Sequence, residues 1–212
     1  MPRVQIKICG LSTPATLDAA VAGGASHVGF VFYPPSPRVL APEQAAALAA
    51  RVPDRVSRVG VFVDPDDALL DRATGSGRLS AVQLHGVAPE RAAAVRARSR
   101  LPLWIAIAVR TRADVTEAHR WHGLADRIIY DAKTPPGALP GGMGMRFDWR
   151  LLDGVAHPAP WALSGGLSPD NVFDAITVTG ASMVDVSSGV ETAPGVKAVD
   201  KIAAFLQAVA RA

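Results

Sequence analysis

The chain has 212 residues, of which 49% are hydrophobic and 19% charged, a composition typical of a soluble globular protein. Its 22 basic and 19 acidic residues leave a net charge of only +3, with arginines scattered among acids, so we expect no nucleic-acid partner. A single cysteine excludes a disulfide-stapled fold, and no stretch approaches the roughly 20 apolar residues of a membrane span. We therefore expect a cytoplasmic protein with no membrane contact.

Short apolar runs alternate with alanine-rich helical segments along the whole chain. The first run covers residues 4–9, and the helix after it is predicted to have Thr13 as its N-cap and Pro14 as its first residue. We expect seven further pairs of strand and helix, at residues 26–32 and 42–52, 58–63 and 64–78, 81–86 and 89–99, 101–109 and 112–121, 127–132 and 147–155, 160–166 and 168–176, and 182–190 and 196–212.

Eight strand-and-helix units with no linker between them predict a single (β/α)8 TIM barrel domain over residues 1–212. The strands are almost continuously apolar, as expected of parallel strands that are covered on both faces. A doubly wound open sheet is the alternative, although it usually has fewer strands.

Each apolar run becomes polar only at its C-terminal end. In a barrel of this kind the active site lies at the C-terminal mouth of the strands, so these polar residues form a candidate site by position alone. They are Cys9, Asp64, Gln83, His85, Arg110, Asp131, Ser164 and Asp185, together with Arg38 in the loop after the second strand.

Two loops rich in small residues follow the seventh and eighth strands. Gly165 and Gly166 lie in one, and Ser187, Ser188 and Gly189 lie in the other. Small residues let backbone N–H groups approach a ligand, and these two loops are the usual phosphate site of such barrels. A third glycine-rich segment, PGGMGMRFDW at residues 140–149 with Gly142, could fold over the same anion as a mobile cover. The glycines could alternatively serve only to make tight turns.

The motifs together resemble the phosphoribosylanthranilate isomerase family over nearly the whole length. They are KICGLS near the start, SPR at 36–38, VQLHG at 82–86, YDAK at 130–133, GGMG with FDW at 141–149, LSGGLSPDNV at 163–172, and VDVSSGVE with PGVK at 184–197. The resemblance implies an isomerase of tryptophan biosynthesis. Its reaction converts N-(5-phosphoribosyl)anthranilate to 1-(2-carboxyphenylamino)-1-deoxyribulose 5-phosphate by an Amadori rearrangement that needs neither a metal nor an organic cofactor.

The resemblance also implies roles for individual residues. Cys9 matches the general base, Asp131 the general acid, and Arg38 the arginine that contacts the anthranilate moiety. Two positions depart from the usual pattern: Met143 stands where Thr is common, and Ser164 where Ala is frequent.

Three further mouth residues are candidates for substrate binding, each with an alternative. Lys7 faces the same side as Cys9 under the two-residue period of a strand, and it either lowers the pKa of the thiol or neutralises a neighbouring acid. His85 lines the mouth or makes a structural hydrogen bond. Asp185 either touches the ligand or fixes the last loop.

Two other functions compete with this prediction. The histidine-pathway isomerase performs the same rearrangement but has Asp in the place of Cys9 and binds a second phosphate. A sugar-phosphate sensor would keep the loops and lose Cys9 or Asp131. As partners we expect a small phosphorylated substrate and, as a functional neighbour, indole-glycerol-phosphate synthase, with the chain a monomer or a homodimer.

Overall fold

Eight parallel strands close into a barrel in which each strand pairs with the next and β8 pairs with β1. The computed structural model describes residues 4–76, 78–135 and 137–212. The predicted (β/α)8 barrel is confirmed. Its strands are β1 (Gln5–Cys9), β2 (His27–Val31), β3 (Ser57–Val63), β4 (Ala81–His85), β5 (Leu103–Val109), β6 (Arg127–Ala132), β7 (Trp161–Leu163) and β8 (Met183–Val186).

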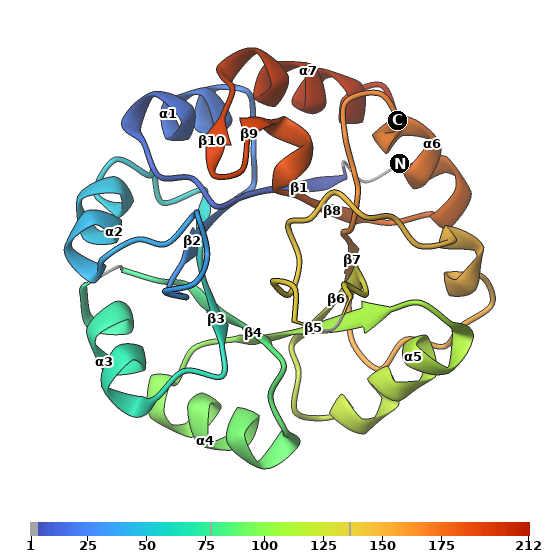
Figure 1. Ribbon diagram of the computed structural model, residues 1–212, viewed down its shortest axis with the longest axis horizontal. Coiled ribbons are helices and arrows are strands. Elements are labelled where there is room, and N and C mark those ends of the chain that lie inside the picture. The colour runs from blue at the N-terminus through green and yellow to red at the C-terminus, as the bar shows by residue number, and fades with distance from the viewer. Residues whose placement is uncertain (1–3, 77, 136) are drawn as a thin grey trace.

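The helices form a ring around the barrel, seen end-on in Figure 1. None of those in the described residues is long and apolar enough to cross a membrane. The α-helices are α1 (Pro14–Ala22), α2 (Pro42–Ala49), α3 (Asp67–Ser76), α4 (Pro89–Ser99), α5 (Arg112–Thr116), α6 (Val172–Thr179) and α7 (Val199–Val209), and the short 3-10 helices are η1 (Glu117–Trp121), η2 (Trp149–Leu152) and η3 (Ser188–Val190).

Local sequence signals explain where several helices begin. The Thr13 side chain accepts a hydrogen bond from the Thr16 backbone N–H, and Pro14 occupies the first turn of α1, as predicted. Helix α3 forms despite its glycine, with Leu70 and Ala73 buried against the barrel. Its predicted extent included position 77, which lies outside the described residues.

The interior of the barrel is built in layers. One apolar layer consists of Val59, Ala81, Trp104, Ile129, Ala162 and Met183, all buried. Three of these stand two residues before polar residues of the mouth: Ala81 before Gln83, Ile129 before Asp131 and Met183 before Asp185. Because side chains two residues apart on a strand share a face, the polar residues form the next layer toward the mouth and lie directly above the apolar layer.

Two predictions about the connections were wrong. The helix predicted at residues 147–155 is only the four-residue η2, because Asp148 caps it at one end and Gly154, with φ of 62°, turns the chain at the other. After β8, the chain forms an unpredicted antiparallel hairpin of β9 (Glu191–Ala193) and β10 (Val196–Lys197) before α7 begins. This hairpin lies beside β1 and α1 at the rim (Figure 1).

Candidate active site

A cavity of about 590 Å3 opens at the C-terminal mouth of the barrel. Cys9 from the end of β1 and Asp131 from β6 both line it, so the two residues predicted to be catalytic share one space. Among its other lining residues are Tyr33, Arg38, Gln83, His85, Ser164, Asp185 and Ser187.

Cys9 is the last residue of β1 and is 8% exposed. Gly29 lies opposite it in the register of β2, where a Cβ atom would come within 2.9 Å of the sulfur. The sulfur therefore occupies space that the missing side chain leaves open. Burial raises the pKa of the Cys9 thiol above its ordinary value, and the nearby Lys7 ammonium opposes that rise.

Lys7 is completely buried beneath the mouth, and its Nζ lies 2.8 Å from Oδ2 of Asp185. Burial alone would lower the pKa of Lys7, but the Asp185 carboxylate and the Cys9 sulfur raise it, so Lys7 stays protonated. The ion pair supports the reading in which Lys7 neutralises an acid. The Lys7 ammonium also acts in the direction of the other reading, because it lowers the pKa of the Cys9 thiol, although burial outweighs this effect in the free protein.

Asp131 carries a carboxyl group with an unusual proton affinity. Its Oδ1 accepts a 2.8 Å hydrogen bond from the Ala132 backbone N–H, and no other hydrogen bond to the group is found among the described residues. Burial raises the pKa of Asp131 to about 7, and the negative charge of Asp185 adds to the rise. The direction is the one expected of a general acid that works near neutral pH.

His85 and Gln83 form a pair on β4. Their Nε2 atoms lie 3.0 Å apart, so the neutral imidazole accepts a hydrogen bond from the Gln83 amide. Burial, with a contribution from Lys7, lowers the pKa of His85 to about 4, so the ring carries no charge at neutral pH. Gln83 Oε1 is buried without a hydrogen-bond partner.

A second cavity, of about 330 Å3, adjoins the first and shares Asp131 and Asp185 with it. It is lined by the predicted anion-binding residues Gly142, Gly165, Gly166, Ser187 and Ser188, and by no arginine or lysine of the described part of the chain. An anion held here would therefore depend on backbone N–H groups and hydroxyls.

The two glycines after β7 are required by their surroundings. Gly165 has φ of 84°, and a Cβ atom there would lie 2.5 Å from the Ala132 nitrogen. Gly166 has φ of 64°, and a Cβ atom there would lie 2.7 Å from the Met145 carbonyl oxygen. Helix α6 begins only at Val172, four residues after the start of the helix predicted at 168–176, so its N-terminus is not directly beside these glycines.

Four predicted positions lie outside both cavities, one of them Lys7, which is buried beneath the mouth. Gly189 packs against the loop after β7, where a Cβ atom would overlap the Leu167 carbonyl, and it lines a neighbouring groove instead. Asp64 and Arg110 are exposed. They directly follow the last residues of β3 and β5 and line neither cavity.

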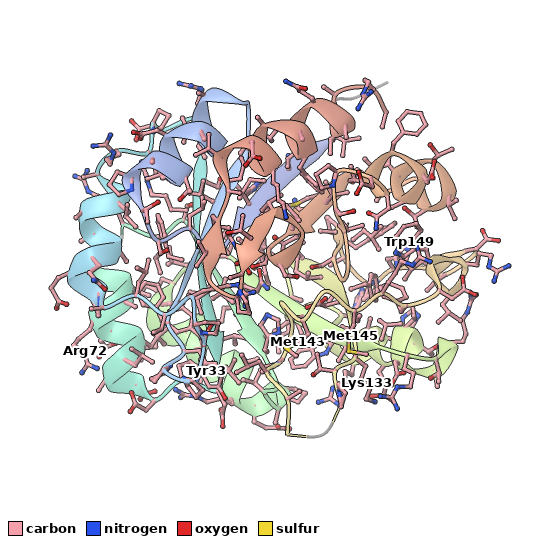
Figure 2. The ribbon with its side chains drawn as sticks, turned by 45° about the horizontal axis from the view of Figure 1, so that its top comes forward. Tyr33, Arg72, Lys133, Met143, Met145 and Trp149 are labelled. Carbon is pink, nitrogen blue, oxygen red and sulfur yellow. The ribbon has the colours of Figure 1, made fainter. Side chains whose placement is uncertain are left out.

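The glycine-rich segment after β6 lies across the mouth. Gly141 lies so close to Asp131 that a Cβ atom would come within 2.6 Å of Oδ2, and the Gly142 carbonyl accepts a 3.0 Å hydrogen bond from Arg38 Nη2. Met143 and Met145, labelled in Figure 2, line the smaller cavity while remaining 50% and 39% exposed.

Arg38 has partners that the sequence analysis did not assign. Its Nε and Nη2 donate to the two carboxylate oxygens of Glu191, at 2.8 and 2.7 Å. Glu191 also accepts from Lys197, and all three residues are buried. Both partners come from the unpredicted hairpin, and they lie in the motifs VDVSSGVE and PGVK. Their signal was a charged residue within an otherwise apolar or small-residue stretch.

The chemistry available to these residues is proton transfer. A carboxyl group that titrates near neutrality and a thiol line one cavity, with a glycine-lined anion pocket beside them. No group of three or more His, Cys, Asp and Glu able to hold a metal ion occurs in residues 4–76, 78–135 and 137–212. The arrangement suits a small anionic molecule that gains a proton at one atom and loses one at another.

Comparisons with known proteins point in one direction. Residues 6–208 match the family described as N-(5'phosphoribosyl)anthranilate (PRA) isomerase. The chain is 55% identical over 208 residues to the N-(5'-phosphoribosyl)anthranilate isomerase of Zymomonas mobilis subsp. pomaceae, covering 97% of this chain and 98% of that one.

Solved structures agree. One is a phosphoribosyl anthranilate isomerase in complex with reduced 1-(o-carboxyphenylamino)-1-deoxyribulose 5-phosphate, 34% identical with a TM-score of 0.84 over 97% of this chain and 98% of that one. Another describes monomers generated from the dimeric enzyme of Thermotoga maritima, 37% identical with a TM-score of 0.83 over 97% of this chain and 98% of that one.

Proposed function

The chain belongs to the N-(5'-phosphoribosyl)anthranilate isomerase family, and from this premise we propose how its residues carry out the reaction. It is an isomerase of tryptophan biosynthesis that converts N-(5-phosphoribosyl)anthranilate to 1-(2-carboxyphenylamino)-1-deoxyribulose 5-phosphate. The rearrangement moves protons within one molecule and leaves its atomic composition unchanged.

Asp131 is the general acid of the proposal. Its carboxyl proton goes to the furanose ring oxygen, the bond from that oxygen to C1′ breaks, and the nitrogen lone pair forms the C1′–N double bond of an imine. The supporting observation is the pKa of about 7, which leaves a proton on the carboxyl of many molecules at neutral pH.

Cys9 is the general base. Its thiolate removes the proton from C2′, the electrons of that C–H bond form the C1′–C2′ double bond, the electrons of the C1′–N double bond return to the nitrogen, and the protonated imine becomes an enolamine. The enolamine then takes a proton at C1′ while its C2′ hydroxyl loses one, which gives the ketone of the product. Burial removes water from the Cys9 thiol, and both proton-transfer groups line one cavity, which fixes their relative positions.

The substrate is oriented by its two anionic ends. We place the phosphate in the glycine-lined cavity with Gly142, Gly165, Gly166, Ser187 and Ser188, and the anthranilate carboxylate toward Arg38. The loops of that cavity come from β7 and β8, which lie between β6 and β1 in the barrel order. A phosphate there would hold the ribose between Asp131 and Cys9.

The observation that carries the proposal is that Cys9 and Asp131 line the same cavity and that the anion pocket adjoins it. Its test is a fluorescence assay, in which freshly prepared phosphoribosylanthranilate loses its anthranilate signal as it is converted. We expect turnover by the unaltered protein and none above background by Cys9→Ala. Tight binding with unchanged fluorescence would instead indicate a sugar-phosphate sensor.

The remaining properties also belong to the proposal. We expect residues 1–212 to act as one domain in the cytoplasm and to function as a monomer or a homodimer. The relative from Thermotoga maritima is described as dimeric. Proximity to indole-glycerol-phosphate synthase stays a prediction.

A further inference from the structure

Glu191 is the centre of a buried charged cluster at the rim of the mouth. Its carboxylate accepts hydrogen bonds from Arg38 Nε and Nη2, from Lys197 Nζ and from the Gly195 backbone N–H. Burial would raise the pKa of Glu191, but Arg38 and Lys197 hold it below its ordinary value. The carboxylate is therefore ionised and fully occupied by this chain, so it has no lone pair left for a ligand.

The fork between Arg38 and Glu191 fixes one orientation of the guanidinium. Because Nε and Nη2 both face Glu191, the third nitrogen, Nη1, points away from it. No described residue accepts a hydrogen bond from Nη1, which lies against Gly142 at the boundary of the larger cavity. The Nη1 group of Arg38 is therefore available to donate a hydrogen bond to a ligand in the cavity.

The backbone around Arg38 is braced by the same hairpin. Gly195, at its turn, packs so closely on the loop after β2 that a Cβ atom would lie 2.5 Å from the Pro37 carbonyl oxygen. Lys197 pairs with Glu191 in the hairpin register and also donates to the Ser187 hydroxyl, 3.1 Å away. The hairpin therefore connects the arginine loop to the anion pocket.

The charges of the cluster do not cancel. Two cations, Arg38 and Lys197, surround one anion, Glu191, so a net charge of +1 lies buried beside the cavity. Burial lowers the pKa of Lys197 and the Glu191 carboxylate opposes that effect. A buried excess of positive charge is costly unless an anion completes it, which is what the carboxylate on the substrate's ring would do.

We propose that Glu191 is a positioning residue that selects substrates bearing a carboxylate on the ring, by holding Arg38 so that Nη1 faces that carboxylate. The inference rests on the proposed function and adds a source of its specificity. It assigns to the β9–β10 hairpin the recognition of the aromatic end of the substrate, separately from proton transfer by Cys9 and Asp131.

The test compares two ligands that differ in one group: reduced 1-(2-carboxyphenylamino)-1-deoxyribulose 5-phosphate and the same compound without the ring carboxylate. Their dissociation constants are measured by calorimetry on the unaltered protein and on Glu191→Gln. The change raises the net charge of the cluster from +1 to +2. If only charge mattered, the carboxylated ligand would therefore bind more tightly, whereas loss of the Arg38 orientation should weaken its binding. Positioning predicts that the preference for the carboxylated ligand falls about tenfold, since a charged fork is lost.

Three outcomes would overturn the positioning role: tighter binding of the carboxylated ligand by Glu191→Gln, equal weakening of both ligands, or no change in either. If Glu191→Gln fails to fold, Glu191→Gln with Lys197→Met restores the net charge of +1 without the fork, and the same loss of preference is expected. Asp18→Asn is the matched control, because it breaks an exposed carboxylate–arginine fork with Arg51 and should leave the preference unchanged.

Turnover of phosphoribosylanthranilate by the unaltered protein is measured on the same preparation. Its absence would overturn the proposed function. A preference that survives Glu191→Gln would overturn only the role given to Glu191.

Discussion

The two proton-transfer groups of the larger cavity differ in exposure and in the charges that act on them: Cys9 is buried, whereas Asp131 is partly exposed. Burial raises the pKa of Cys9 on one side and of Asp131 on the other. At Cys9 the ammonium groups of Lys7 and Lys197 oppose the effect of burial while Asp185 adds to it, whereas at Asp131 the carboxylate of Asp185 is the largest charge effect and adds to that of burial, with Lys7 opposing it more weakly. Desolvation thus raises both pKa values. At the acid a neighbouring anion increases the rise, and at the base neighbouring cations limit it.

This difference determines the pH dependence of kcat/KM. The fully protonated enzyme lacks a thiolate, and the fully deprotonated enzyme lacks the acid proton, so only the form with a single proton can react. Because the pKa of Asp131 is about 7 and that of Cys9 is above its ordinary value, kcat/KM should rise as pH increases through about 7 and fall at higher pH through the thiol pKa. The reactive arrangement, thiolate with protonated carboxyl, is the minor one of the two singly protonated forms.

The largest effect is expected from a substitution that removes the acid, Asp131. Asp131→Asn keeps the shape of the side chain and loses the proton, so kcat should fall about 10³-fold, a typical contribution of general acid catalysis, while KM changes little. Steady-state kinetics measure both. A fall of only a few-fold would remove Asp131 from the mechanism, and Asp18→Asn, on the far surface, is the control.

The next largest effect is expected from removing the Asp185 charge, which adds to the pKa rise at Asp131. Asp185→Asn removes the anion that raises the pKa of both Asp131 and Cys9 and leaves Lys7 without its partner. Both limbs of the pH–rate profile should then move to lower pH, by about one unit if the interaction is worth roughly 1.4 kcal/mol. A rising limb that stays near pH 7 would contradict the role given to Asp185.

A smaller effect is expected on the base side, since Lys197 remains when Lys7 is replaced. Lys7→Met should move chiefly the falling limb, to higher pH, and reduce kcat/KM about fivefold, because a one-unit rise in the thiol pKa corresponds to roughly tenfold at most. It also leaves Asp185 buried and unpaired, so the profile is repeated on Lys7→Met with Asp185→Asn, which restores neutrality. A falling limb at the native position would show that Lys7 does not act on the thiol.

The smallest effect is expected from a substitution in the glycine-rich segment after β6, which lies close to Asp131. Met143→Thr restores the residue usual at this position, on a side chain that is 50% exposed. We expect KM to change about twofold and kcat and both limbs to remain unaltered, as for most exposed substitutions. A shifted rising limb would show that the segment also controls the proton affinity of Asp131.

The sequence predicted what depends on a single strand or loop. The barrel follows from apolar runs of regular spacing, and Cys9 and Asp131 follow from polar residues at strand ends. Glu191 was missed because its function depends on Arg38, 153 residues away, and on a two-residue strand with no periodicity of its own. The direction of the net pKa shift of the Cys9 thiol could not be predicted either. The two-residue period shows that Lys7 and Cys9 share a face, but it does not show how deeply the thiol is buried.

The ion pair between Lys7 and Asp185 joins the first strand to the last. The two residues are 178 positions apart and directly opposite in the register of β1 and β8. During synthesis, therefore, the thiol leaves the ribosome early with Lys7 beside it, but it meets Asp185 and Lys197 only after the final strand has been made and the ring is complete. A fragment that ends before β8 would hold the sulfur and the carboxyl of the proposed mechanism, yet it would lack Asp185 and the anion-pocket residues Ser187 and Ser188, so catalytic competence in this fold is acquired at ring closure.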